Sequence, residues 1–278
     1  MIHIIITTLN YLPYTQLCVR AIMENTGQPY RIILVDDAST DGTVEWAKTV
    51  PQLTIVENTG KRHGWWQGNN LGLDVGPADY YAFLDRDMVV TRNWLTKLIE
   101  LLEKHPEVGV ASPVASNGPG EQAVPQGSNT VVWPGGWPGK QWIPEVLAYE
   151  EIQTFGAYNE DRLRGLWIYN APLWFHCVVM PHRTVERVGR FDERFFWCDG
   201  DIDYSYRVLK AGLLTAVRLD TYAHHQGMAY AGPNRWDSGH FGPQPTTFWY
   251  EKYPGTSPST PEGKDWNLLL PHKDFMNV

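Results

Sequence analysis

Short apolar runs rich in β-branched residues alternate with segments of helical spacing through the first hundred residues. The runs are IHIIITTL at residues 2–9, RIILVDD at 31–37, LTIVEN at 53–58 and YYAFLD at 80–85. Because most positions in them are apolar, rather than every second one, they predict strands that are buried on both faces. Helical signals lie at residues 14–25, 39–50, 69–76 and 93–105. This alternation predicts a parallel sheet with helices on both faces.

Polar residues follow three of these runs, at the points where the predicted strands end. They are Thr7-Thr8-Leu9-Asn10, Asp36-Asp37 and Asp85-Arg86-Asp87. A D-x-D segment taken alone is best explained as a strand end followed by a solvated turn. In parallel sheets of this kind, however, ligands bind beyond the carboxyl ends of the strands. We therefore expect all three groups to face one crevice.

Composition narrows the class of protein. The formal net charge is 23 − 31 = −8, and no basic run stands out, which argues against broad binding to a nucleic-acid backbone. Cys18, Cys177 and Cys198 are too few and too scattered for a disulfide framework, and they predict reduced thiols in the cytoplasm. The N-terminus lacks a charged leader and is predicted as a strand. No run approaches the roughly 20 apolar residues that span a bilayer.

The second half of the chain is less regular. Residues 112–142 are dense in Gly, Pro and Asn, which predicts a long functional or mobile loop. Residues 173–189 indicate a strand leading to a helix, and TAVRL at 215–219 indicates another short strand. From Asp220 the chain is rich in aromatic residues, glycine and proline, and we expect it to wrap over the domain.

Five segments, taken in order, resemble the inverting family-2 nucleotide-sugar glycosyltransferases of GT-A fold. They are IIITTLN, VDDASTDGT, NTG followed by GNNLG, FLDRDMVV, and GRFDERFFWCDGDIDYSYRVLKAG. The likeness extends from about residue 2 to 255, and YNAPLWFHCVVMPHRTVERVG is most similar to the spore-coat polysaccharide branch. The ordered set is far more specific than any one of its motifs.

The resemblance implies a Rossmann-like, mostly parallel α/β sheet flanked by helices, with acceptor-side loops and an irregular C-terminal tail. Residues 1–111 would form the half that binds the donor, and residues 112–228 the half that binds the acceptor and carries catalysis. Residues 229–278 would form the tail, which with the 112–142 loop is a candidate lid within one continuous domain.

The activity implied by the resemblance is metal-dependent, inverting transfer of a hexosyl or pentosyl group. The donor is a nucleoside-diphosphate sugar, with UDP-sugars favoured, and the acceptor is a hydroxyl. Mn²⁺ or Mg²⁺ would offset the charge of the diphosphate. Asp87 is expected as a direct metal ligand, and Asp85 as a contact to ribose or to a metal-bound water. His224 would complete the metal site, with His225 as the next candidate.

The residues expected to bind the donor follow from the same motifs. Their positions are Thr7, Asp37, Lys61, Asn69, Asp85 and Arg86. Asp37 resembles the aspartate that reads the uracil-type base, while Arg86 would offset the carboxylate pair or reach a phosphate. Leu9 stands where the family often has an aromatic residue, so Trp65 or Trp66 either stacks on the base in its place or simply packs.

Catalysis by inversion needs a base for the acceptor hydroxyl. Asp201 is the candidate, at the expected start of a helix, and a plain N-cap is the alternative. Asp203 and Arg207 are spaced as a structural i,i+4 ion pair. Gly200 stands where the family commonly has glutamate, and Asp199 is the candidate for the missing carboxylate. Asp199, His176 and Trp197 are expected on the acceptor side, although His176 also suits a satisfied histidine at a strand end.

Two other functions remain open at this stage. A nucleotidyltransferase also uses paired aspartates on a Rossmann-like sheet, but the first turn here reads TTLNYLP instead of a glycine-rich basic loop. A non-catalytic sugar-nucleotide or glycan-binding module is suggested by Gly200. The absence of GxGxxG after the first strand and of GxxxxGK[ST] argues against dehydrogenases and P-loop enzymes. The acceptor is open, and a modified nucleobase stays among the candidates.

Overall fold

The computed structural model describes residues 1–58, 60–116, 147–196, 199–226, 246–259, 261, 266–271 and 276–277. Its strands are β1 (Ile2–Thr8), β2 (Tyr30–Asp36), β3 (Leu53–Val56), β4 (Tyr80–Asp85), β5 (Met88–Val90), β6 (Val108–Ala115), β7 (Leu166–Tyr169), β8 (Cys177–Pro181), β9 (Leu214–His225) and β10 (Met276–Asn277). Within these residues, the strands form one sheet in the order β10-β7-β9-β6-β8-β4-β1-β2-β3, with β5 paired to β9. Most strands run in one direction, and β5, β7 and β8 run against it.

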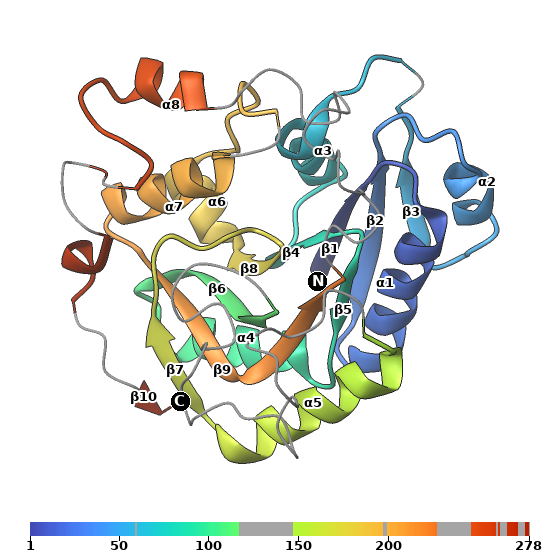
Figure 1. Cartoon of the computed structure of the whole chain (residues 1–278), viewed down its shortest axis with the longest axis horizontal. Coiled ribbons are helices and arrows are strands. Elements are labelled where there is room, and N and C mark those ends of the chain that lie inside the picture. Colours follow the sequence, from blue (N-terminus) through green and yellow to red (C-terminus); the bar gives the residue numbers. More distant parts are fainter. Residues whose placement is uncertain are drawn as a thin grey trace, which may run out of the picture.

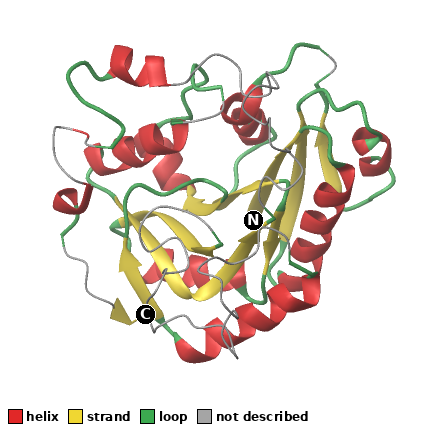
Figure 2. Ribbon diagram, viewed as in Figure 1, coloured by secondary structure: helices red, strands yellow, loops and turns green. Residues whose placement is uncertain are grey.

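Helices cover both faces of this sheet (Figures 1 and 2). They are α1 (Leu12–Asn25), α2 (Thr43–Ala47), α3 (Gly64–Leu73), α4 (Trp94–Lys104), α5 (Tyr149–Arg162), α6 (His182–Val188), α7 (Gly200–Lys210), α8 (Thr246–Lys252) and a 3-10 helix, η4 (Trp266–Leu269). Thr15 of α1 shares a hydrogen bond with Thr8, whereas Gly72 of α3 packs on Ile5. Ile5 and Thr8 are three positions apart in β1, and side chains along a strand alternate between its faces. Ile5 and Thr8 therefore point to opposite faces, and α1 and α3 lie on opposite sides of β1.

The register of the first strands brings the three polar strand ends together. β1 lies between β2 and β4 and is parallel to both, with Thr8 opposite Asp36 and Thr7 opposite Asp85. All seven residues of β1 are buried, as expected for a strand covered on both faces. The predicted parallel α/β sheet is confirmed, and it delivers these polar residues to one edge.

The predicted loop at residues 112–142 is wrong at its start. β6 continues to Ala115, and all eight of its residues are buried. It pairs in parallel with β9 and has a register shift between Pro113 and Val114, where the proline interrupts the ladder. β9 is likewise longer than the predicted strand at residues 215–219, since it runs to His225. The rest of the predicted loop, residues 117–146, lies outside the described part of the chain.

Among the elements without a counterpart in the predictions are α5 and β7. The buried residues of α5 are Ile152, Phe155, Gly156 and Asn159, so the stripe that faces the sheet is only half apolar and gives a weak periodic signal. Gly156 is required there because a Cβ would collide with Thr91. α3 begins at Gly64, five residues before the predicted start, and Gly64 has the positive φ of 76° that suits glycine.

The second half of the chain enters the same sheet as the first. β8 lies between β4 and β6, and the expected boundary at residues 111–112 falls inside β6. The described parts of the tail contain α8, η4 and β10, and β10 pairs with β7 at the edge of the sheet. Cys18 and Cys177 are buried free thiols. Among the described residues, no helix combines the length and apolar character needed to cross a bilayer.

Candidate metal and active site

Asp85 ends β4 and is held from two sides. The indole N–H of Trp65 donates to its Oδ1 at 2.6 Å, and His176 Nδ1 lies 2.8 Å from its Oδ2. The backbone N–H of Asp85 also donates to the carbonyl of His176 at 2.9 Å. His176 directly precedes β8, which is antiparallel to β4. It therefore enters the sheet at the edge where β4 leaves it.

His225, the last residue of β9, completes this cluster. Its ring lies nearly parallel to that of His176, with centroids 4.2 Å apart and an interplanar angle of 24°. Its Nε2 is 3.3 Å from Asp87 Oδ2 and 3.8 Å from Asp85 Oδ2. One ligand atom each from Asp85, His176 and His225 lie within 4.8 Å of one another. Carboxylate oxygens and imidazole nitrogens at this spacing fit a divalent cation.

The charges in this cluster depend on one another. Burial acts to raise the pKa of Asp87, but His225 and Arg86 outweigh it and hold that pKa below its ordinary value. Burial acts to lower the pKa of His225, but Asp87 and Asp85 outweigh it and raise that pKa. Burial and then the charge of His225 lower the pKa of His176. The two imidazoles therefore differ, with His225 the more basic.

The structure favours the second of the two predicted histidines. His224 is fully buried, and its Nδ1 lies 2.8 Å from the hydroxyl of Tyr222. Neighbouring residues of a strand point to opposite faces, so only His225 reaches Asp85 and Asp87. The metal ligand was expected at His224, and the residue that lies beside Asp85 and Asp87 is His225. His176, expected on the acceptor side, lies beside Asp85.

Asp37 is turned toward the loop that precedes α3. It is 1% exposed and accepts the backbone N–H groups of His63 at 2.6 Å and Gly64 at 3.2 Å. Arg62 Nε donates to the same carboxylate at 3.4 Å. These contacts fix the loop, and the part of Asp37 in binding the donor stays a prediction. Asp41 accepts from Thr43 Oγ1 at 2.6 Å, as expected for a turn.

The other residues expected to bind the donor line the same region. Thr7 and Asn69 are buried at the interface of β1 and α3, where neither Thr7 Oγ1 nor Asn69 Oδ1 has a hydrogen-bond partner among the described residues. Arg86 is buried, and its guanidinium carbon lies 5.4 Å from the ring centroid of Tyr11. Lys61 lines a cavity of about 570 Å³ between the end of β3, α3 and the loop at Phe196.

Asp201 occupies the first turn of α7. It is half-buried, and its Oδ1 accepts the backbone N–H of Ile202 at 2.9 Å. Burial raises the pKa of Asp201 to about 7, and the charges of Asp199 and Asp85 add to this shift. Asp201 is thus within electrostatic reach of Asp85, at the same end of the sheet. A carboxylate with this pKa can accept a proton near neutral pH.

Two tryptophans connect α7 to Asp85. Trp66 packs against Gly200 so closely that a Cβ there would overlap its indole, which gives a physical reason for glycine where the family commonly has glutamate. Trp65 lies against Trp66, with centroids 4.4 Å apart, and donates to Asp85. Both are buried, so packing, and not base stacking, explains them. Because a buried indole N–H needs a hydrogen-bond acceptor, a polar partner for Trp65 could be expected from the sequence. Trp197 lies outside the described residues.

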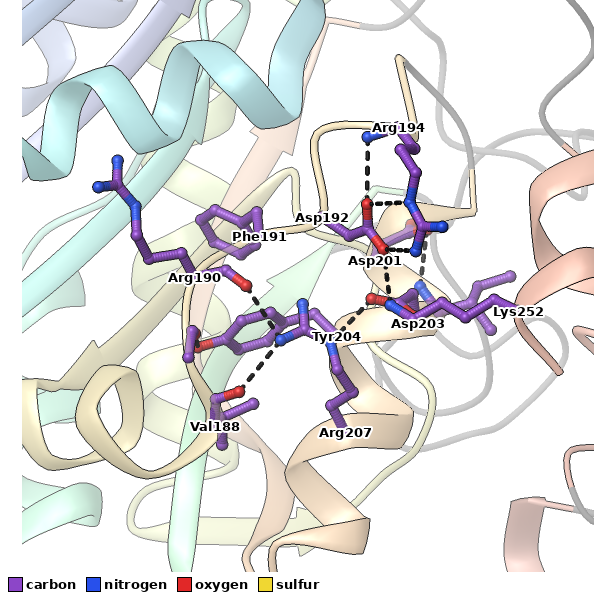
Figure 3. Close-up of polar contacts among 12 residues, drawn as sticks. Val188, Arg190, Phe191, Asp192, Arg194, Asp201, Asp203, Tyr204, Arg207 and Lys252 are labelled. Atoms are coloured by element: carbon purple, nitrogen blue, oxygen red, sulfur yellow. Dashed lines mark hydrogen bonds and ion pairs between the residues drawn. The ribbon is translucent and has the colours of Figure 1, made fainter.

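An ionic network anchors α8 to α7 (Figure 3). Asp203 is fully buried and accepts from Arg207 Nε at 2.8 Å, the predicted i,i+4 pair. Lys252 Nζ lies 2.7 Å from Asp203 Oδ1 and 2.8 Å from Asp192 Oδ2. The hydroxyl of Tyr253 donates to Asp203 at 2.8 Å. The network thus ties α8 to the helix that carries Asp201.

Residues 3–166 match the family described as glycosyl transferase family 2. The chain belongs to this family. This family-2 glycosyltransferase is 25% identical over 236 residues to N-acetylglucosaminyl-diphospho-decaprenol L-rhamnosyltransferase of Mycobacterium tuberculosis, covering 77% of this chain and 72% of the relative. It is 23% identical over 219 residues to a chondroitin synthase of Escherichia coli, covering 73% of this chain and 31% of the synthase. The expected class of enzyme, a glycosyltransferase, is confirmed.

Solved structures agree on the fold. One is a mannosyltransferase from Pyrobaculum calidifontis, solved in complex with GDP-Man and Mn²⁺, with a TM-score of 0.58 and 20% sequence identity. The similarity covers 84% of this family-2 chain and 59% of the mannosyltransferase. GalNAc-T7 with UDP, GalNAc and Mn²⁺ has a TM-score of 0.57 at 18% identity, over 81% of this chain and 43% of that chain. The expected GT-A fold is confirmed. The family-2 chain spans less than two thirds of either of these proteins.

Proposed function

We propose that this glycosyltransferase moves a sugar from a nucleoside-diphosphate sugar, with UDP-sugars favoured, to an acceptor hydroxyl with inversion at the anomeric carbon. The observation that carries this proposal is the place of Asp201 in the first turn of α7, which packs through Gly200 and Trp66 on the Trp65 that holds Asp85. Burial raises the pKa of this carboxyl to about 7. A general base works best with a pKa near the working pH. Structural neighbours in complex with GDP-Man or UDP support the class of donor.

A divalent cation belongs to this proposal. Asp85, Asp87 and His225 would hold it, and Mn²⁺ or Mg²⁺ suits their oxygen and nitrogen atoms. When bound, such an ion offsets the negative charge that develops on the leaving diphosphate. The Mn²⁺ in the two solved relatives supports this assignment.

The residues of the chain divide the remaining work. Asp201 accepts the proton of the acceptor hydroxyl as its oxygen attacks the anomeric carbon. The free N–H groups at the start of α7 favour the charged form of that carboxylate. Asp199, two residues earlier, supplies a second carboxylate for acceptor hydroxyls.

Donor binding uses the opposite side of the crevice. Thr7, Lys61, Asn69 and Arg86 contribute polar groups around the donor, and Arg86 is suited to phosphate oxygens because guanidinium offers a fork of donors. Asp37 acts through the loop that it holds, since its carboxylate fixes the backbone of His63 and Gly64.

The proposal is tested with a panel of UDP-, GDP- and dTDP-linked sugars and Mn²⁺, first without an acceptor and then with candidate hydroxyl acceptors. We expect slow release of nucleoside diphosphate from one donor class, loss of release on chelation, and a product whose anomeric configuration is inverted by NMR. Asp201→Asn should lower transfer by about 10²–10⁴-fold with donor affinity nearly unchanged. Transfer by Asp201→Asn at the wild-type rate, or retention of configuration, would contradict the proposal.

A further inference from the structure

Trp174 lies on a short segment that runs from α7 to the end of β4. At one end of the segment, the backbone N–H of Leu173 donates to Ser205 Oγ of α7 at 3.1 Å. At the other end, His176 contacts the carboxylate that ends β4. Asp201 precedes Ser205 by four positions on α7, so their side chains are neighbours on one face of this helix. The segment therefore connects the helix face that carries the proposed base to the candidate metal site.

The side chains of this segment differ in their exposure. Leu173 and Phe175 are buried, and the ring of Phe175 lies 6.0 Å from that of Trp66. Trp174, between them, is 37% exposed, and no other tryptophan in the described part of the chain is among the exposed large apolar side chains. Its ring makes a T-shaped contact with His176, with centroids 5.6 Å apart. Buried neighbours thus fix the backbone of an indole that is partly open to solvent beside the candidate site.

Asp199 provides a second observation, at the start of α7. It is the N-cap residue of this helix, two positions before Asp201. Its Oδ2 is buried and has no hydrogen-bond partner among the described residues. A buried carboxylate oxygen without a donor is costly, and the hydroxyl groups of a bound acceptor can satisfy it. The same end of the sheet thus offers an aromatic face and an acceptor of hydroxyl protons.

We infer that Trp174 is the platform for a sugar ring of the acceptor, so that this transferase acts on an uncharged carbohydrate hydroxyl. This inference rests on the proposed function, because it places that ring beside the proposed base. A pyranose has an apolar C–H face, which suits the flat face of an indole, and a rim of hydroxyls, which suits Asp199 and Asp201. The two carboxylates disfavour an acidic sugar, since like charges repel.

Sugar binding can be measured without turnover. The full chain with ¹⁵N-labelled tryptophan, in the presence of UDP and Mg²⁺, is titrated with the methyl β-glycosides of glucose, galactose, mannose and N-acetylglucosamine. Comparison with Trp174→Phe assigns the indole signal of Trp174. We expect at least one glycoside to shift this signal, with saturation transfer strongest at the C–H protons of one sugar face. The probes 1-hexanol, N-acetylserinamide and cytosine should leave the signal in place.

Trp174→Leu keeps an apolar side chain but removes the flat aromatic face. We expect the Kd of the bound glycoside to rise at least about fivefold, with UDP affinity nearly unchanged by calorimetry. Trp174→Phe should recover part of the loss because it restores a ring. Trp46→Leu removes a half-buried tryptophan from α2 and is the matched control, which should bind the glycoside as the wild type does.

The outcomes separate this inference from the proposed function. If none of the glycosides shifts the Trp174 signal of the folded wild type, or if only a non-sugar probe does, the inference is overturned and the proposed function stands. An unchanged glycoside Kd in Trp174→Leu also overturns it. Retention of configuration, or full transfer by Asp201→Asn, overturns the proposed function and leaves the glycoside-dependent shift as it is. If Trp174→Leu does not fold by circular dichroism, the wild-type titration decides.

Discussion

Trp65 donates its indole N–H to Asp85 Oδ1 at 2.6 Å and thereby couples α3 to the D-R-D segment. Trp65→Phe keeps an aromatic ring in the cluster but removes the donor. We expect transfer to fall about tenfold, because Asp85 is no longer fixed, and the free energy of unfolding to fall by about 1–2 kcal/mol. Steady-state rates and urea unfolding measure the two effects. Trp167→Phe in β7 is the control for ring loss, and an equal loss of transfer there would contradict the role of Trp65.

Gly200 and Trp66 compete for the same space. A Cβ at residue 200 would overlap the Trp66 indole, so Gly200→Ala should lower the free energy of unfolding by about 1–3 kcal/mol. Trp66→Phe makes room, and the cost of Gly200→Ala should shrink in that background. A double-mutant cycle measured by denaturant unfolding checks this coupling. Strictly additive costs would show that the two residues do not constrain each other.

Transfer should depend on pH through Asp201. Because its pKa is about 7 and the base must be ionised, the rate should rise as pH increases through 7, and Asp201→Asn should lose this rise. A profile of rate against pH at saturating donor measures it. A flat profile between pH 6 and 8 in the wild type would remove Asp201 from the role of base.

The same carboxyl affects stability in the opposite sense. Its folded pKa of about 7 lies above the ordinary 3.8, so its contribution to stability is complete below about pH 4 and is lost as pH rises through about 7. Asp201→Asn should therefore match the wild type at pH 4 and be more stable at pH 8, by on the order of 1–3 kcal/mol. Thermal unfolding at both pH values tests this, and a variant that is less stable at pH 8 would contradict it.

Lys252 joins two carboxylates across the surface of α7. It lies 2.7 Å from Asp203 and 2.8 Å from Asp192, and Asp203 is fully buried. Lys252→Met should destabilise the protein by about 1–3 kcal/mol and release α8 to proteolysis, because a buried carboxylate loses one of its cations. Lys48→Met breaks an exposed pair with Glu57 and should cost under about 1 kcal/mol. Equal costs would mean that the Lys252 network adds nothing beyond an exposed pair.

The sequence predicted those parts of the fold whose signal is local. Continuous β-branched runs identify buried strands, and polar residues at their ends identify the edge of the sheet that carries the crevice. α5 escaped prediction because Gly156 and Asn159 replace apolar residues on its buried face. Pro113 and its neighbours indicated a loop, although tertiary pairing holds them in β6.

The residues of the candidate site also divide into those with a local signal in the sequence and those placed by tertiary pairing. Asp85, Asp87 and Asp201 follow from motifs, but the choice between His224 and His225 depends on the phase of β9, which its pairing with β5 fixes. The place of His176 beside Asp85 depends on pairing between residues 91 positions apart. Neither relation has a local signature, and the contact of Trp66 with Gly200 has none either.

β8 runs against both of its neighbours, β4 and β6. His176, the residue in front of it, therefore approaches the end of β4 from the opposite direction and contacts Asp85 there. Its backbone belongs to the segment before β8, and not to the segments that follow β1, β2 or β4. An antiparallel strand in an otherwise parallel neighbourhood thus brings a side chain from a separate stretch of the sequence to this edge of the sheet.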